Sequence, residues 1–208
     1  MNHQTKTICL HRWLIIFYKV SDIPQSYEEA MQSTEAGLWQ VAMEDEMASL
    51  SANETFELVP KRDHKIIGGR WVYCKKVDHQ NNYVHKARYV GKGYKQQFNV
   101  DYTESFSPTA RMTSVRILTH LASQQNMVVH SVDFKSAYLN APIDHDVFMN
   151  QPPGFEVKDK NGELLVYKLN KSLYGLKQSG QMWYNMLHCY LVDNGFVRSD
   201  CENCFIVV

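Results

Sequence analysis

Apolar residues recur at spacings of three and four in an acidic stretch of the chain: Trp39, Met43, Met47 and Leu50. In a helix this spacing brings the four side chains onto one face. The acids among them mostly fall on the other faces: Glu44, Asp45 and Glu46. The pattern therefore predicts a helix that packs through one side and exposes an acidic side to solvent.

A shorter period follows. Residues 70–77 (RWVYCKKV) and 83–90 (YVHKARYV) are rich in β-branched and aromatic residues, and the DHQNN segment between them is typical of a turn. This pattern predicts a β-hairpin. On its second strand Lys86 and Arg88 lie two positions apart, in line with Val84 and Val90, so all four side chains project from one face.

The remainder of the chain alternates helical and extended patterns. Apolar spacing predicts a helix at 114–125, and an apolar run predicts a strand at 127–133. Residues 91–110 are expected to form a connection, and residues 146–155 an extended segment that ends in a turn. A strand is expected at 164–169 and a helix from about Ser179 to the glycine at 195. Together these elements indicate an α+β protein.

Composition narrows the class of protein. Hydrophobic residues make up 44% of the chain and charged residues 21%, which is typical of a globular protein and not of a disordered or fibrous one. The five cysteines are odd in number and scattered, so we expect no disulfide framework. Such cysteine usage favours a reducing, intracellular location, either cytoplasmic or nuclear.

The amino-terminal region contains one membrane-like stretch, residues 13–18 (WLIIFY). It is far shorter than the roughly 20 apolar residues of a membrane-spanning helix. Basic residues flank it, and no small-residue cleavage site follows. We therefore expect a buried strand or a poorly ordered end here, and no membrane association.

Charge is segregated along the chain although the formal net charge is zero. Residues 28–57 carry eight acidic side chains and no Lys or Arg, whereas residues 65–95 carry eight Lys or Arg and one acid. A solvated sheet face is one account of the basic region, and binding of a polyanion is the other. Tyrosines interleave with the cations and could stack on bases, which keeps nucleic-acid binding open: Tyr73, Tyr83, Tyr89 and Tyr94.

Three stretches of the chain share a known order and spacing. They are RWVYCKKV…HKARYVGKGYKQQFNVDYTESFSPTARMTSVR, then HSVDFKSAYLNAPI, then KLNKSLYGLKQSGQMWY. In this order they resemble the reverse transcriptase of Ty1/copia-type retrotransposons, and the resemblance runs from about residue 23 to residue 205. It implies a right-hand polymerase fold. The fingers would span about 23–125 and part of the palm about 126–208, after a less characteristic segment at 1–22.

The resemblance implies a polymerase site around Asp133. This residue matches the first catalytic aspartate of the palm, which binds two Mg²⁺ ions, and the backbone carbonyl of Phe134 would add a metal contact. Tyr138 matches the aromatic residue beneath the incoming sugar that disfavours a ribonucleotide. Arg88 matches the arginine that grips the triphosphate, and Lys76 matches a lysine with a similar task.

The same resemblance implies further contacts with substrates. LYGLKQ matches the segment that packs on the nucleotide and the template, with Gly175 allowing a close backbone approach and Lys177 adding a positive charge. The implied partners are an RNA template, a DNA primer and deoxynucleoside triphosphates. Four more basic residues are expected to contact nucleic acid: Lys75, Lys86, Lys92 and Lys95.

The chemistry of nucleotidyl transfer agrees with these residue types. Transfer from a triphosphate uses two divalent ions about 4 Å apart, and Mg²⁺ prefers carboxylate oxygens, phosphate and water. Fixed cations stabilise the charge that develops. A guanidinium binds phosphate through two parallel hydrogen bonds, which favours Arg88 over the nearby lysines as the main phosphate contact.

One part of the family pattern is missing. The family carries its other metal ligands on a hairpin with two consecutive aspartates, and these 208 residues contain no such pair. In the family that hairpin follows shortly after a segment such as RSDCENCFIVV, so we expect it beyond residue 208. Asp144 and Asp146 are not expected to replace it, because the helical segment after Asp133 would carry them away.

This gap leaves three functions open. The first is a fragment of an RNA-directed DNA polymerase without polymerase activity as it stands, because one carboxylate does not hold two Mg²⁺ ions. The second is a nucleic-acid-binding remnant of a retrotransposon Pol protein that has no catalysis. The third is an unstable product without function.

Overall fold

The computed structural model describes residues 9–10, 13–14, 23–78, 80–200 and 202–207. Its elements in chain order are β1 (Cys9–Leu10), β2 (Trp13–Leu14), α1 (Tyr27–Gln32), α2 (Ala36–Ala52), β3 (Phe56–Pro60), β4 (Ile66–Ile67), β5 (Gly69–Val77), β6 (Tyr83–Gly91), η2 (Gly93–Lys95), α3 (Met112–Gln124), η3 (Ala137–Asn140), β7 (Phe148–Met149), β8 (Leu165–Leu169), α4 (Ser179–Asp193), β9 (Val197–Arg198) and β10 (Ile206–Val207). The mixed α and β composition expected from the sequence is confirmed. β1 and β2 pair with each other, and most of the apolar run 13–18 lies outside the described residues.

The predicted β-hairpin is confirmed and forms the centre of the fold. β5 and β6 pair antiparallel along their whole length, from Gly69 opposite Gly91 to Val77 opposite Tyr83. Side chains alternate between the two faces of such a pair. One face is buried and carries aromatic and small residues: Trp71, Tyr73, Ala87 and Tyr89. The opposite face, called the open face below, carries Lys86 and Arg88, which were expected to share a face, and also Lys76 of the first strand.

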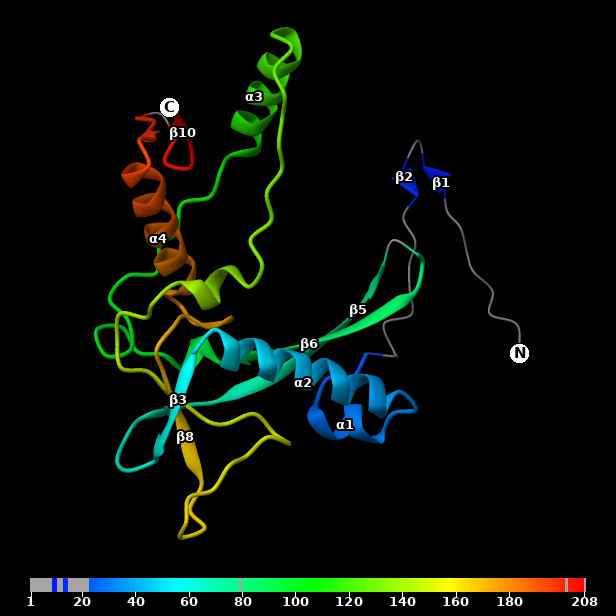
Figure 1. Cartoon of the computed structure of the whole chain (residues 1–208), viewed down its shortest axis with the longest axis vertical. Helices are drawn as coiled ribbons and strands as arrows, with labels where there is room; N and C mark the ends of the chain where they lie inside the picture. Colours follow the sequence, from blue (N-terminus) through cyan, green and yellow to red (C-terminus); the bar gives the residue numbers. More distant parts are fainter. Residues whose placement is uncertain (1–8, 11–12, 15–22, 79, 201, 208) are drawn as a thin grey trace.

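The predicted acidic helix is confirmed as α2, which lies along the hairpin and contacts β6 (Figure 1). Trp39, Met43 and Leu50 are buried, with 1% exposure or less. The Trp39 ring meets the Tyr73 ring edge-on, with the ring centroids 5.2 Å apart. Burying each of these large side chains contributes roughly 2 kcal/mol, so this contact is a main source of stability.

A four-stranded sheet with the order β3-β8-β7-β4 supports the hairpin from another side. The strand expected at 164–169 is confirmed as β8, while the extended segment 146–155 contains only the short β7. Two side-chain hydrogen bonds tie the hairpin to the chain next to β7. Tyr89 Oη donates to the Asn150 carbonyl at 2.8 Å, and Trp71 Nε1 donates to the Pro153 carbonyl at 3.1 Å.

The strand expected at 127–133 does not form, so that prediction is wrong. These residues have no regular structure, and Val128 and Val132 are 79% and 74% exposed. A strand needs a neighbour that pairs with its backbone N–H and C=O groups, and none of the described strands pairs with this segment. The helix before it is confirmed as α3, yet α3 has no buried residue. In Figure 1, α3 stands away from the hairpin and the following segment runs back beside it.

The helix predicted from about Ser179 is confirmed as α4. Gly195 follows its end with a φ of +88°, a left-handed conformation that glycine adopts without steric cost. α4 packs against η3 and thereby supports the turn between Asp133 and η3. Within the described part of the chain, every helix is too short or too polar to cross a bilayer.

Candidate functional site

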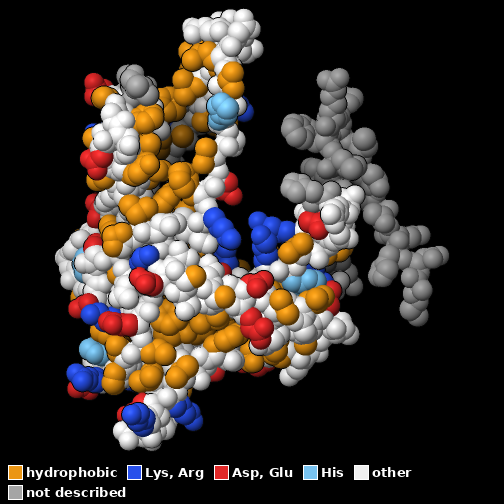
Figure 2. Space-filling model, viewed as in Figure 1, with side chains coloured by type: hydrophobic (Ala, Val, Ile, Leu, Met, Phe, Trp, Pro, Cys, Tyr) orange, Lys and Arg blue, Asp and Glu red, His pale blue; other side chains and the backbone are white. Residues whose placement is uncertain are grey.

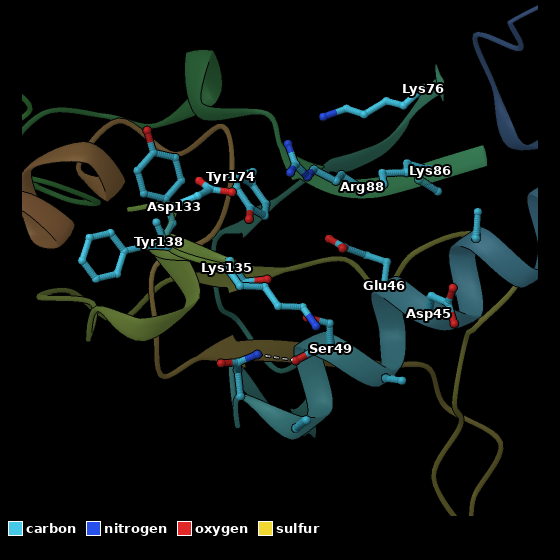
Figure 3. A pocket seen from close by; sticks show the side chains of 18 of the residues that line it. Asp45, Glu46, Ser49, Lys76, Lys86, Arg88, Asp133, Lys135, Tyr138 and Tyr174 are labelled. Carbon is cyan, nitrogen blue, oxygen red and sulfur yellow. Dashed lines mark hydrogen bonds between the residues drawn. The ribbon is translucent and has the colours of Figure 1, made fainter. Parts of the chain in front are cut away.

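A cleft of about 1160 Å³ lies between α2, the open face of the hairpin and residues 133–138 (Figure 3). Figure 2 shows Lys and Arg side chains gathered at a hollow on this side of the molecule. The charged residues that line the cleft are four Lys or Arg and three acids: Lys76, Lys86, Arg88, Lys135, Asp45, Glu46 and Asp133. The acidic and basic regions of the sequence therefore meet at this cleft.

Six residues singled out in the sequence line this one cleft: Lys76, Lys86, Arg88, Asp133, Phe134 and Tyr138. The hairpin supplies the three cations. The segment 133–138, which runs through a turn into η3, supplies the other three residues. Lys76 and Arg88 point from the hairpin toward the side where Asp133 lies (Figure 3). The fold thus brings together two motifs that are far apart in the sequence.

Tyr174 connects the two walls of the cleft. The guanidinium carbon Cζ of Arg88 lies 4.7 Å from the centre of the Tyr174 ring. The Tyr174 and Tyr138 ring centroids are 5.5 Å apart, and the rings are tilted by 57°. Burial raises the pKa of Tyr174 above its usual value, and the nearby Arg88 opposes this rise only in part. The ring is therefore a neutral phenol at neutral pH.

Asp133 lies just before a turn at residues 135–136 that is held by local contacts. Ser136 has a φ of +53° in the left-handed region, which costs a residue other than glycine about 1–2 kcal/mol. Asn140 Nδ2 reaches the carbonyl oxygens of residues 135–137 at 3.5, 3.2 and 3.4 Å. These hydrogen bonds hold the turn, while the Asp133 side chain itself is exposed.

Gly175 lies outside the cleft lining and packs against the end of β6. It has a φ of +86°, and an added Cβ would overlap the Gly91 carbonyl oxygen and the Val90 side chain. Next to it, the Gly91 N–H donates to the Tyr174 carbonyl at 2.8 Å. In this structure the close backbone approach at Gly175 is to β6, and the expected approach to the nucleotide and the template stays a prediction.

Three predicted basic residues gather around the same end of β6, also outside the cleft lining. The Lys177 N–H donates to Oε1 of the buried Gln96 at 2.7 Å, which places Lys177 beside the loop that carries Lys92 and Lys95. Gln96 Nε2 in turn donates to Gln178 Oε1 at 3.0 Å. This buried hydrogen-bond network joins the LYGLKQ segment to the loop after β6.

Lys75 and two of the tyrosines face away from the cleft. Lys75 Nζ pairs with a carboxylate oxygen of Glu35 at the amino-terminal end of α2. Tyr73 and Tyr89 are 6% and 1% exposed, so the expectation that they could stack on bases is wrong, because they belong to the core. Two other tyrosines of the region remain available on the surface, with 61% and 74% exposure: Tyr83 and Tyr94.

Sequence reasoning missed four residues of the cleft. Lys135 and Tyr174 belong to motifs that were recognised, but neither was singled out. Trp183 of α4 meets the Phe134 ring edge-on, with centroids 5.1 Å apart, and it too belongs to a recognised motif without being singled out. Glu46 was expected on a solvated face.

Glu46 is half-buried where α2 meets β6. Its Oε1 accepts a hydrogen bond from the Tyr89 N–H at 3.3 Å. Burial raises the pKa of Glu46, and the Tyr89 N–H and the charge of Arg88 oppose the rise. Helical spacing does distinguish this acid: Glu46 lies three residues after Met43 and four before Leu50, on the apolar face of the helix, and grouping it with Glu44 and Asp45 overlooked this.

The residues of the cleft do not make a site for two Mg²⁺ ions. Among the described residues, no group of three or more Asp, Glu, His or Cys side chains could hold a metal. Asp144 contacts His145 at 3.0 Å, and Asp146 contacts Lys168 at 3.4 Å. Neither acid lines the cleft, so neither supplements Asp133.

Comparison with known proteins identifies the family. The family model for reverse transcriptase (RNA-dependent DNA polymerase) matches residues 53–207. The retrovirus-related Pol polyprotein from transposon RE1 of Arabidopsis thaliana is 39% identical over 184 residues, which cover 86% of this chain and 12% of that protein. The corresponding polyprotein from transposon TNT 1-94 of Nicotiana tabacum is 36% identical over 183 residues, which cover 87% of this chain and 14% of that protein.

A yeast relative agrees. The truncated transposon Ty1-A Gag-Pol polyprotein of Saccharomyces cerevisiae is 35% identical over 136 residues, which cover 65% of this chain and 10% of that protein. No solved structure matches the chain. The chain spans a small part of each relative, 14% at most among these three. It belongs to the reverse transcriptase family, within the Ty1/copia-type retrotransposon Pol polyproteins.

Proposed function

We propose that this chain is the nucleotide-binding part of a retrotransposon reverse transcriptase, with the fingers at about 23–125 and part of the palm at about 126–208. One observation carries the proposal: the hairpin cations and the turn from Asp133 to Tyr138 line a single cleft. Its volume of about 1160 Å³ exceeds the roughly 300–1,000 Å³ of a small-molecule pocket. There is room for a nucleotide and the end of a nucleic-acid strand.

In this proposal a deoxynucleoside triphosphate lies with its phosphates toward the hairpin and its sugar toward Tyr138. Arg88 grips the phosphates through parallel hydrogen bonds, and Lys76 adds a second positive charge. Tyr138 lies beneath the sugar and disfavours a 2′-hydroxyl group. Lys86 and Lys135 neutralise phosphates of the RNA template or the DNA primer.

The metal requirement limits what the chain does alone. Reverse transcriptases generally use Mg²⁺, and a pair of ions supplies the charge stabilisation for nucleotidyl transfer. Asp133 and the Phe134 carbonyl offer too few ligands for such a pair within the described residues. We therefore expect nucleotide binding without primer extension. An extension assay on a primed RNA template with Mg²⁺ or Mn²⁺ checks this, and robust synthesis would refute it.

Nucleotide binding itself is testable at Arg88. Titration of the chain with dATP and Mg²⁺ should show saturable binding, weakened at least about tenfold by Arg88→Met, because a charge-assisted phosphate contact is lost. Arg70→Met is the matched control, since Arg70 is an exposed arginine on the same face of the hairpin that does not line the cleft. Equal affinities of the two variants would contradict the role of Arg88.

A second candidate function is nucleic-acid binding without catalysis. The lining of the cleft favours it, because its four Lys or Arg side chains outnumber its three acids. Binding to an RNA–DNA duplex should then weaken steeply with salt and be lost in the double variant Lys86→Glu/Arg88→Glu. Binding that this double change leaves intact would count against the candidate.

A further inference from the structure

The Arg88 side chain contacts a ring and forms no ion pair within the described part of the chain, although its charge interacts with that of Glu46. Its Cζ lies 4.7 Å from the Tyr174 ring centre, and no ion pair joins Arg88 to an acidic side chain among the described residues. A cation–π contact orients a guanidinium without neutralising it. The N–H donors of Arg88 therefore stay free for an anion.

The Tyr174 ring also contacts Tyr138, the residue proposed to lie beneath the sugar. The centroids of Tyr174 and Tyr138 are 5.5 Å apart, within the range of favourable aromatic pairs. Tyr138 lies in η3 at the opposite wall of the cleft. Tyr174 thus lies between the residue assigned to the phosphates and the residue assigned to the sugar (Figure 3).

The backbone of Tyr174 is fixed to the hairpin. Its carbonyl accepts the Gly91 N–H at 2.8 Å, and Gly175 leaves no room for a Cβ against β6. The ring therefore stays in register with β6, the strand that carries Arg88. The two ring contacts form one continuous line from Arg88 through Tyr174 to Tyr138.

We propose that Tyr174 is a positioning residue that couples the triphosphate contact at Arg88 to sugar selection at Tyr138. This inference rests on the proposed function. It means that discrimination between a deoxyribonucleotide and a ribonucleotide depends on Tyr174, which contacts neither the phosphates nor the sugar in that proposal. Because coupling between sites is reciprocal, discrimination also depends on Arg88.

The test compares the affinities of the full chain for dATP and for ATP, each with Mg²⁺. Tyr174→Leu removes the ring, so the ratio of the two affinities should fall at least about fivefold toward one, the lower end of typical coupling between sites. Tyr174→Phe keeps both ring contacts and should keep the ratio within about twofold. If Tyr174 has a purely structural role, Tyr174→Leu should lower the affinities for dATP and ATP equally and leave their ratio unchanged.

Arg88→Met keeps the test decisive if Tyr174→Leu does not fold, because Arg88 is exposed. If Arg88 only contacts phosphate, Arg88→Met should lower the affinities for dATP and ATP by the same factor. If the coupling exists, Arg88→Met should also lower the ratio of the two affinities. The control variant Arg70→Met should change neither the two affinities nor their ratio. A wild-type chain that binds neither nucleotide contradicts the proposed function, and with it the coupling. A wild-type chain that prefers dATP, with a preference unchanged in Arg88→Met and in a folded Tyr174→Leu, overturns the coupling alone.

Discussion

The hairpin with α2 and the α3 region both have apolar patterns that predict regular elements, yet only the first has a buried face. Trp39, Trp71 and Tyr89 are 3% exposed or less. α3 has no buried residue, and Val128 in the segment after it is 79% exposed. The difference lies in the partners. β5 and β6 pair with each other and α2 packs beside them, whereas no described strand pairs with residues 127–133.

The two regions show how far an apolar period predicts packing. It tells which side chains would share a face of an element, and it does not tell whether another surface covers that face. Asp133 lies where the two regions meet. The turn after it is held by Asn140 and by packing against α4, and the segment before it has no strand partner. The chain is therefore well supported after Asp133 and weakly supported before it.

Hydrogen exchange should show the largest contrast. Amides in the paired strands β5 and β6 should exchange through nearly global unfolding, which costs roughly 5 kcal/mol or more in a stable domain. Amides of residues 127–133 should exchange almost as in a free peptide, because no strand protects them. Exchange followed by mass spectrometry of peptic peptides measures this. Protection of 127–133 equal to that of the hairpin would contradict the comparison.

A matched pair of leucines tests the packing itself. Leu50 in α2 is 1% exposed and Leu118 in α3 is 49% exposed. Leu50→Ala should lower the free energy of unfolding by about 2–5 kcal/mol, because it leaves a cavity. Leu118→Ala should cost less than about 1 kcal/mol, since half of its surface is already in water. Urea unfolding followed by tryptophan fluorescence compares them, and similar midpoints would break the contrast.

A pair of glycines sharpens the account of how the hairpin is joined to the LYGLKQ segment. Gly175 and Gly162 have φ values of +86° and +83°, but a Cβ would overlap the β6 backbone only at Gly175 and would meet nothing within 4 Å at Gly162. Gly162→Ala should cost about 1–2 kcal/mol from backbone strain alone. Gly175→Ala should cost measurably more in the same urea experiment, and the excess reports the close contact with β6.

The local elements could be predicted from the sequence, and the long-range contacts could not. Both strands of the hairpin and their turn are contiguous, so one window holds the whole pattern. β3 was not predicted, since its five residues pair with β8, far along the chain. The false strand at 127–133 has the same cause, because strand formation depends on a neighbour outside the window.

The site divides in the same way. Arg88, Asp133 and Tyr138 could be found because they belong to motifs of a known family, and the fold brings them to one cleft. The contact between Arg88 and Tyr174 could not be found, since nothing in either motif states that they meet. Glu46 was misplaced with its neighbours Glu44 and Asp45, although its spacing of three from Met43 and four from Leu50 puts it on the face of α2 that packs against β6.

Glu46 gives the smallest expected effect and is an acid at the packed contact between α2 and β6. Burial raises its pKa, so the folded state binds a proton at Glu46 more tightly than the unfolded state does. The resulting stabilisation is present below the unfolded pKa of about 4.3 and is lost as pH rises through the folded value. Glu46→Gln keeps an acceptor for the Tyr89 N–H but has no charge to desolvate. The variant should therefore gain stability relative to the wild type as pH rises above about 4.3.

The control is Glu44→Gln, which removes an exposed carboxylate from the same helix and should change the free energy of unfolding by less than about 0.5 kcal/mol at neutral pH. Urea unfolding of the three proteins from pH 4 to pH 8 makes the comparison. If the advantage of Glu46→Gln grows with pH and that of Glu44→Gln does not, the cause is burial at the α2–β6 contact and not a change in net charge. If both variants follow the same curve, Glu46 is solvated despite its position on the apolar face of the helix, and the packed region ends before it.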